Sequence, residues 1–284
     1  MVNKRARSQR SITARAAWYM VLPILLIMAL FTLYPYGYAL WTSVRQVSPL
    51  LPPKFVGLDN YVDVITGRYF VGSVRNTLIF ALFSVPATVL LGLGAALLLN
   101  QSFRGNTILR GVVLLPWAIP TVVSGVIWKG VFADTWGALN AVLYTLGLIT
   151  NYLRWLTTAR LAMFTVILAQ VWTQFPLAAV LLLASMQAIP DELYDAAAID
   201  GAGIRQRFRY VTLPAIRPML IIVTIFECLM ALTAFDITYG LTGGGPGTAT
   251  TFISYYTWSE TFRMLSFGRG AALAVIIALA ALAL

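Results

Sequence analysis

The sequence has no histidine, one cysteine and few charged residues. Without histidine, catalysis by an imidazole base and most zinc sites are excluded. The single cysteine, Cys228, excludes a disulfide within the chain. No G-x-x-x-x-G-K-[ST] pattern occurs, so the chain has no P-loop that could bind nucleotide phosphates. Charged residues make up only 11% of the 284 residues, which is too few for an ordinary soluble domain.

Hydrophobic residues are abundant, at 60% of the chain, and this predicts an integral membrane protein with several spans. The net charge of +10 could suggest a nucleic-acid partner. The basic residues, however, lie between apolar runs and do not form one patch with stacking aromatic residues. The lipid bilayer is therefore the expected partner, and no nucleic acid is expected.

The apolar runs predict an all-α protein with six membrane spans, at residues 17–44, 76–99, 111–128, 161–186, 218–239 and 267–284. A basic arm at residues 1–16 contains no acid, which places the N-terminus in the cytoplasm. The following run is too long for a signal peptide and lacks a cleavage site. An amphipathic interfacial helix is an alternative for the arm. Residues 17–284 are expected to form a single transmembrane domain.

Prolines are expected to shape the spans and the outer loops. Pro86 predicts a kink in the second span. Pro116 and Pro120 would free backbone carbonyls in the third span, so this span is expected to face the interior of the bundle. Residues 45–75 are expected to form an outer loop. Residues 129–160 form a second one, whose apolar patch at 141–149 is too short to cross a bilayer.

The longest polar interruption is the loop at residues 189–214, between the fourth and fifth spans. Pro190 and the two acids after it predict a helix start, and Gly201 and Gly203 predict its end. Small and apolar residues at helical spacing give this helix a low face that a partner could approach: Leu193, Ala196, Ala197 and Asp200. A second short helix is expected, with Ile204, Phe208 and Val211 on one side. The alternative is an ordinary solvated helix-loop-helix.

The loop carries the phrases Asp195-Ala196-Ala197, Asp200-Gly201-Ala202 and Val211-Thr212-Leu213-Pro214. These resemble the EAA loop of ABC importer permeases, in the carbohydrate branch that includes the maltose, glycerol-phosphate and lactose permeases. Asp195 stands where the motif has glutamate, so the charge is kept with one methylene fewer. In that family the loop docks into the ATPase subunit. The resemblance implies this coupling role for Glu192, Asp195, Ala196, Ala197, Asp200, Gly201, Leu213 and Pro214.

Two external phrases also resemble carbohydrate permeases. One is FVGLDNY at residues 55–61, and the other joins Phe235-Asp236 to the run from Leu241 to Pro246, as in the first of the two subunit types. The glycine run at Gly243, Gly244, Gly245 and Pro246 is expected to be a flexible external loop that contacts a solute-binding protein. It could also mimic an anion-binding nest, but it lacks a lysine.

The resemblance implies the fold and the partners. The fold would be the six-span type I transmembrane domain of an ABC importer, in the bacterial cytoplasmic (inner) membrane. The partners would be a second homologous permease subunit, two ATP-binding subunits and an external solute-binding protein. The chain itself would be no enzyme and would hold no cofactor, because ATP and Mg²⁺ would bind to the ATPase subunits.

Several polar residues within the spans are candidates for the substrate pathway. Gln170, Trp172, Thr173 and Gln174 could bind sugar hydroxyls and stack on a sugar ring, or they could form hydrogen bonds between helices. Glu227 and Asp236 are the acids within an expected span. Glu227 could instead be a protonated or paired carboxyl in helix packing, and Asp236 a cap. Their spacing of nine residues puts them out of phase on a straight helix.

The expected function is therefore ATP-driven import of a sugar or sugar derivative. Arginine is absent from the spans except near their ends, and this favours a neutral sugar over a phosphorylated one. One alternative is a secondary transporter that uses Glu227 as an ion site, although no convincing internal repeat supports it. A second alternative, an integral-membrane enzyme, lacks a clustered acid pair or a metal-ligand spacing.

Overall fold

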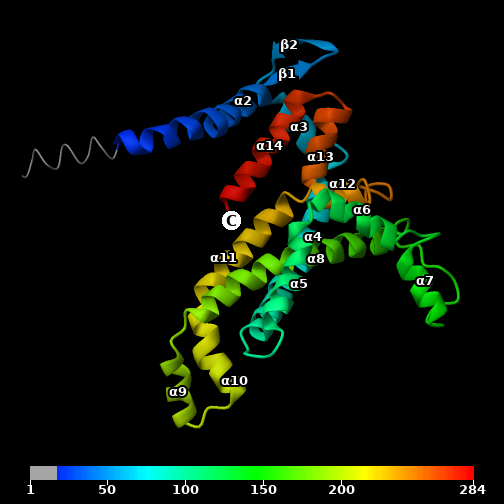
Figure 1. The fold of residues 1–284 in the computed structure, drawn as a ribbon. Coiled ribbons are helices and arrows are strands. Elements are labelled where there is room, and N and C mark those ends of the chain that lie inside the picture. The colour runs from blue at the N-terminus through cyan, green and yellow to red at the C-terminus, as the bar shows by residue number, and fades with distance from the viewer. Residues whose placement is uncertain (1–17) are drawn as a thin grey trace, which may run out of the picture. The chain divides into compact units, whose positions relative to one another are not determined.

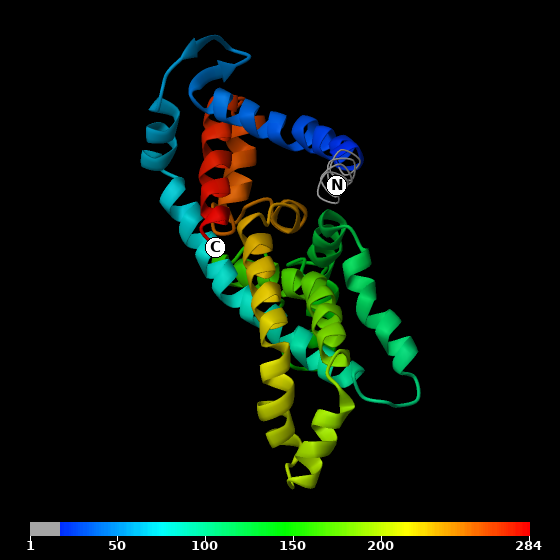
Figure 2. The same cartoon turned by 90° about the vertical axis from the view of Figure 1, so that its left-hand side faces the viewer.

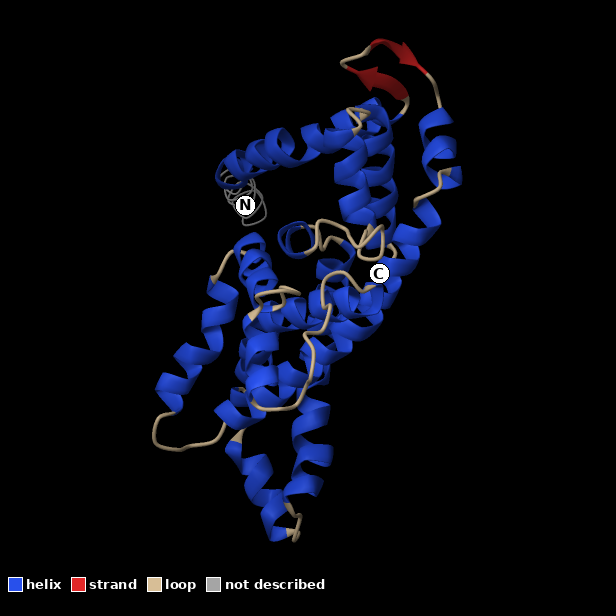
Figure 3. Cartoon of the chain, turned by 90° about the vertical axis from the view of Figure 1, so that its right-hand side faces the viewer, coloured by secondary structure: helices blue, strands red, loops and turns tan. Residues whose placement is uncertain are grey.

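The computed structural model describes residues 18–284, and the basic arm at residues 1–16 lies outside this range. The described chain is helical apart from one two-stranded sheet, as Figure 3 shows. It divides into two compact units, which are described separately. The first holds the described residues up to Val64 together with Glu260–Ile276. The second holds Ile65–Ser259 and Ile277–Leu284.

The first unit begins with a long apolar helix, Trp18–Ser43. This helix includes a π-helical turn, η1 (Ala29–Leu33), followed by α2 (Tyr34–Ser43). The other elements of this unit are β1 (Arg45–Ser48), β2 (Leu51–Phe55), α3 (Asp59–Thr66), the π-helical η3 (Ser259–Arg263) and α14 (Phe267–Leu282). The ends of α3, η3 and α14 extend into the second unit.

Strands β1 and β2 form an antiparallel hairpin within the expected outer loop at residues 45–75. Arg45 pairs with Phe55 and Ser48 with Leu51. The sequence did not predict this sheet, because Pro52 and Pro53 lie inside it. A proline is tolerated in β2 because the hairpin has only two strands, so each strand has an open edge where no backbone donor is needed.

The second unit is a helical bundle. Its elements are α4 (Phe70–Leu99), α5 (Asn106–Ala118), α6 (Thr121–Val131), α7 (Ala138–Thr145), α8 (Ala159–Gln187), α9 (Asp191–Ile199), α10 (Ile204–Arg207), η2 (Phe208–Thr212), α11 (Leu213–Leu232), α12 (Asp236–Leu241) and α13 (Ile253–Trp258). Helices α4, α8 and α11 pack against one another and contribute to both buried apolar clusters, the first of which also includes Ile237 and Leu241 of α12 (Figure 1). Gly92 lets α4 approach α8, because a Cβ atom there would lie 2.7 Å from the Cβ of Ala178.

Four helices are long and apolar enough to cross a membrane: Trp18–Ser43, Phe70–Leu99, Ala159–Gln187 and the continuous helical stretch Ile204–Leu232. The bent pair α5 and α6 would make a fifth span. Helix α14 is apolar but has only 16 residues. A mainly helical chain with several helices long and apolar enough to cross a membrane is thus confirmed for the described residues, whereas the count of six spans is not.

The third expected span, residues 111–128, is not one straight helix. Helix α5 ends at Ala118, α6 begins at Thr121, and their axes differ by 95°. Ile119 is extended, with φ −86° and ψ 128°. The ring of Pro120 disfavours helical geometry at the residue before it, and Pro120 has no backbone donor. By contrast, α4 is one continuous helical element from Phe70 to Leu99, with Pro86 inside it.

The fifth expected span, residues 218–239, also differs from the structure. Helix α11 ends at Leu232, and α12 begins only at Asp236. The Thr233 hydroxyl donates to the Leu229 carbonyl at 2.9 Å, so a side chain uses a carbonyl at the end of the helix. The remaining expected spans agree with the helices to within a few residues, except that α4 begins six residues earlier, at Phe70 rather than residue 76.

Candidate functional site

The expected coupling loop protrudes beyond the ends of α8 and α11 (Figure 1 and Figure 2). Helix α9 starts directly after Pro190, and Asp191 and Glu192 occupy its first turn, as the sequence predicts. Both carboxylates are exposed. They lie at the end of the helix where backbone donors are unpaired and the dipole is positive, so they stabilise its start.

The end of α9 is a Schellman motif built on Gly201. The Ala202 N–H donates to the Ala197 carbonyl at 2.9 Å, and the Gly201 N–H donates to the Ala198 carbonyl at 3.0 Å. Gly201 has φ +76°, a left-handed conformation that strains any residue with a Cβ atom. The DGA phrase therefore has a structural reason, because the glycine reverses the chain while satisfying the last carbonyls of α9.

A second short helix follows within two residues. The Gly203 N–H donates to Oε1 of Gln206 at 2.8 Å, and Nε of Arg207 donates to the Ala202 carbonyl at 2.9 Å. These bonds fix the turn from both sides. The α9–α10 connection is thus held by its own hydrogen bonds.

Tyr194 anchors α9 to the bundle. Its hydroxyl lies 2.9 Å from Oγ1 of Thr212, and its ring packs on the apolar cluster that includes Ile189 and Ile216. Leu213 is half-buried and Pro214 is exposed at the start of α11, as position and residue type lead one to expect. Pro214 costs no hydrogen bond within α11, although the preceding π-helical turn runs directly into this helix.

The outer surface of this loop is apolar at several points. The expected low face is solvent-accessible: Leu193, Ala196 and Asp200 are exposed and Ala197 is half-buried. Asp195 is also exposed. Sequence reasoning missed the strongest feature, since Ile199 and Ile204 are 87% and 88% exposed. Ile204 was expected beside Phe208 and Val211, which are half-buried, but it points away from the bundle. Isoleucines that flank the D-G-A-G turn were the available signal.

The polar residues of α8 lie inside the bundle. Gln170 and Thr173 are buried, whereas Trp172 and Gln174 are half-buried. The Thr173 hydroxyl donates to the Gln170 carbonyl of the same helix at 2.8 Å, so its hydrogen is not free to bond to a ligand. The indole of Trp172 meets that of Trp128 edge-on, with ring centroids 5.6 Å apart. These side chains offer amides and an aromatic edge at one level of α8.

Glu227 and Asp236 lie in different environments. Glu227, in α11, is 3% exposed, and its Oε1 has no hydrogen-bond partner among the described residues. Asp236 is exposed in the first turn of α12. The break at residues 233–235 puts the two acids on separate helices, so the structure, like the sequence, gives no reason to join them in one site.

Two further buried hydroxyls were missed by sequence reasoning. Ser84 and Thr88 lie one turn apart on α4, both are buried, and neither hydroxyl has a partner within residues 18–284. Helix α4 packs against α11, which carries Glu227. The spacing of Thr77, Ser84 and Thr88, seven and then four residues, marks one helix face and was the available signal.

The glycine run after α12 forms hydrogen bonds with the threonines that follow it. The Thr250 hydroxyl donates to the Gly245 carbonyl at 2.7 Å, and the Thr251 hydroxyl donates to the Gly244 carbonyl at 3.0 Å. Gly244 is buried against Tyr255. Gly243 is exposed, and Gly245 and Pro246 are half-buried. A Cβ atom at Gly244 would clash with Tyr255 and Thr251, which explains the glycine there.

Within residues 18–284, no three His, Cys, Asp or Glu side chains are grouped closely enough to hold a metal ion.

The profile of the family "Binding-protein-dependent transport system inner membrane component" matches residues 88–284. The trehalose/maltose transport system permease protein MalF of Thermococcus litoralis is 39% identical over 93% of this chain and 88% of its own length. The sulfoquinovosyl glycerol transport system permease protein SmoG of Agrobacterium fabrum is 36% identical over 90% and 83%.

A third relative is the sn-glycerol-3-phosphate transport system permease protein UgpA of Yersinia pestis, which is 35% identical over 92% of this chain and 88% of its own. Among solved structures, one chain of a bacterial ABC transporter involved in the import of the acidic polysaccharide alginate matches with a TM-score of 0.81. It is 23% identical and covers 98% of this chain and 95% of its own. At that identity the likeness concerns the fold alone.

Proposed function

Because this chain belongs to the family of binding-protein-dependent transport system inner membrane components, we propose that it moves a neutral sugar or sugar glycoside across the inner membrane. It is a permease subunit of an ABC importer and not an enzyme. The observation that carries the substrate class is the similarity of over nine-tenths of the chain to the permease named for trehalose and maltose. That similarity favours the ABC importer over the ion-coupled alternative.

Six spans with a cytoplasmic N-terminus complete the proposed topology. The bent pair α5 and α6 supplies the third span and α14 the sixth. This arrangement puts the protruding α9–α10 connection on the same side as the basic arm, where ATP is available. The hairpin and the glycine run then lie outside. The density of Lys and Arg is higher in the segments assigned to the inside, in accord with the positive-inside tendency.

The exposed α9–α10 connection supports a coupling role. Burying a large apolar side chain contributes about 1.5–3 kcal/mol, so Ile199 and Ile204 are suited to dock into a partner. The partner would be an ATP-binding subunit, which would supply ATP and Mg²⁺. Glu192, Asp195, Asp200 and Gly201 would lie at that contact. Closure of two such subunits would pull on this rigid turn and change the packing of α8 and α11.

The inner faces of α8, α11 and α4 would form the solute pathway. Amides from Gln170 and Gln174 can donate to and accept from sugar hydroxyls, and Trp172 offers an apolar ring. The buried oxygen of Glu227 without a partner would be satisfied by a hydroxyl donor. Asp236, exposed on α12, would lie near the outer end of this pathway. The long helix Trp18–Ser43, whose apolar side chains are exposed, would meet lipid and a second permease subunit.

Purification of the chain from its native membrane tests this function. We expect two ATPase subunits and a second permease to copurify. We also expect ATP hydrolysis to rise when a binding protein loaded with trehalose or maltose is added. A binding protein loaded with glycerol 3-phosphate tests the charge of the substrate. If it stimulated ATP hydrolysis as strongly as a binding protein loaded with a neutral sugar, the proposal of a neutral substrate would be wrong. Purification of the chain without an ATPase would contradict the whole assignment.

A further inference from the structure

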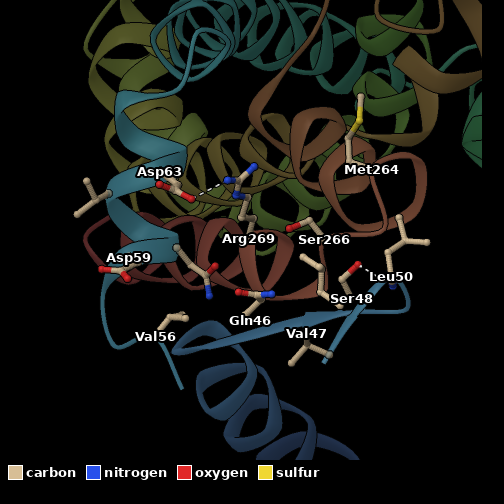
Figure 4. A pocket seen from close by; sticks show the side chains of 13 residues that line it. Gln46, Val47, Ser48, Leu50, Val56, Asp59, Asp63, Met264, Ser266 and Arg269 are labelled. Atoms are coloured by element: carbon tan, nitrogen blue, oxygen red, sulfur yellow. Dashed lines mark hydrogen bonds and ion pairs between the residues drawn. The ribbon is translucent and has the colours of Figure 1, made fainter. Parts of the chain in front are cut away.

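The first unit contains a cavity of about 510 Å³ between the β-hairpin, α3 and the start of α14 (Figure 4). Its polar lining comes from Gln46 and Ser48 on the hairpin, from Asp59, Asn60 and Asp63 on α3, and from Ser266 and Arg269. Apolar side chains from the same three segments complete the wall. Pockets of several hundred Å³ bind ligands or protein side chains. None of the residues assigned to the solute pathway lines this one.

The wall of the cavity is preformed. Nδ2 of Asn60 donates to the carbonyls of Ser43 and Arg45, both at 2.8 Å, and so ties α3 to the base of the hairpin. Gly268 packs directly against Arg45 and Asn60, and a Cβ atom there would clash with both. A cavity held open in this way binds without first reorganising, which favours affinity.

The charges around the cavity favour a cationic group. Arg269 donates to the Asp63 carboxylate at 2.6 Å, which pairs those two charges. Asp59 also lines the cavity, and in the described part of the chain no cation lies within ion-pair distance of its carboxylate. Two carboxylates against one guanidinium give the lining a net charge of −1. A lysine or arginine side chain would complement it.

The remaining lining favours a protein over a free sugar. No aromatic ring lines the cavity, so it lacks the flat apolar surface on which a sugar ring stacks. Leu50 and Leu51, at the hairpin turn, are exposed. Exposed apolar residues beside a charged cavity are typical of a surface that a protein partner covers.

We propose that this hairpin cavity is a docking site for the solute-binding protein, which inserts a basic side chain beside Asp59. The inference rests on the proposed function, since it takes the hairpin to be external and a binding protein to be present. The basic side chain would pair with Asp59, while the protein around it covers Leu50 and Leu51. This contact is separate from the glycine run, where Gly244 is buried.

The test uses the whole transporter, with its second permease and ATPases, in lipid nanodiscs, and a sugar-loaded binding protein. We expect Asp59→Lys to raise the Kd of the binding protein about tenfold or more, because a cation then faces a cation. Asp59→Asn should give a smaller loss and a weaker dependence on salt. Gln46→Trp, which fills the cavity, should also weaken binding. Lys54→Gln is the matched control on the hairpin, since Lys54 is exposed outside the cavity.

The basal ATPase rate and recovery of all subunits serve as checks on folding and assembly. If hydrolysis by the wild-type transporter does not respond to any binding protein, the proposed function itself fails. If the wild type responds, and Asp59→Lys and Gln46→Trp bind as well as wild type, the docking site is wrong. Loss of the second permease from these variants would instead identify the cavity as a subunit interface and would also overturn the proposal.

Discussion

The α9–α10 connection and the hairpin cavity differ in where their contacts come from along the chain. Around the Gly201 turn the backbone bonds span three to five residues, and the longest tie, Tyr194 to Thr212, spans 18. In the hairpin cavity, Arg269 pairs with Asp63 across 206 residues. Local contacts can be read from neighbouring residue types, whereas distant ones depend on the whole fold. The comparison explains which features could be predicted.

The largest effect is expected at the exposed isoleucines of the α9–α10 connection. A variant with both Ile199→Asp and Ile204→Asp should lose its ATPase subunits on purification. In the proposed complex two apolar side chains would be buried against the ATPase subunit, and the variant would bury two carboxylates there in their place. The expected cost is at least about 3 kcal/mol, or over a hundredfold in affinity. The control, Ile199→Val with Ile204→Val, should keep the complex. Equal recovery of ATPase from both variants would show that this tip is merely solvated.

The next effect concerns the turn itself. Gly201→Val should uncouple ATP hydrolysis from uptake, because a β-branched residue at φ +76° costs about 1–2 kcal/mol and shifts the turn. We expect uptake to fall about tenfold in proportion to that cost. Gly203→Ala is the matched control, since Gly203 has φ −71° and an added Cβ atom would meet only Oε1 of Gln206, at an ordinary contact distance of 3.9 Å. Coupled uptake by Gly201→Val at the wild-type rate would remove the lever role.

These two sites show how far the sequence leads. The start of α9, its glycine end and the short second helix follow from residue types within a few positions, so they were predicted. The bend at Pro120 follows from an equally local rule, since a proline disfavours helical geometry at the residue before it. It was not predicted because the continuous apolar run at residues 111–128 was taken as one span. The Asp63–Arg269 pair joins residues 206 positions apart, and the burial of the Ser84 and Thr88 hydroxyls depends on the packing of whole helices. No local pattern specifies them.

A third prediction tests the hydrogen bonds between Asn60 and the base of the hairpin. Asn60→Ala removes both bonds from Nδ2, so the carbonyls of Ser43 and Arg45 lose a donor, at a cost of about 1–3 kcal/mol. We expect faster proteolysis within the hairpin and weaker docking of the binding protein. Asn140→Ala is the control, because Asn140 makes similar bonds to the backbone of Leu153 in a different loop.

Asn140→Ala should loosen its own loop and leave the hairpin protected. If Asn60→Ala left the hairpin as resistant to protease as the wild type, then its frame would depend on strand pairing alone. The cavity would in that case be less rigid than its contacts with Asn60 suggest. A hairpin cut equally fast in both variants would mean that the loss is not specific to Asn60.

The smallest effect on stability is expected at Thr88, one of two buried threonines on α4 whose hydroxyls differ in their hydrogen-bond partners. The Thr77 hydroxyl donates to the Ser73 carbonyl at 2.8 Å and accepts from the Ile253 N–H at 2.9 Å, whereas the buried Thr88 hydroxyl has no partner in the described chain. Valine has the same shape as threonine. Thr77→Val should therefore lower the Tm in detergent, at a cost of about 1–3 kcal/mol, because the Ile253 donor is left unpaired.

Thr88→Val should leave the Tm unchanged or raise it, because it removes a buried hydroxyl that bonds to nothing in this conformation. If Thr88 belongs to the solute pathway, the same variant should raise the KM for sugar uptake several-fold, because one hydrogen bond contributes about 1 kcal/mol. A KM equal to that of the wild type would mean that the hydroxyl only packs against α8 or α11. A fall in the Tm as large as that of Thr77→Val would mean that Thr88 has a partner within the assembled transporter.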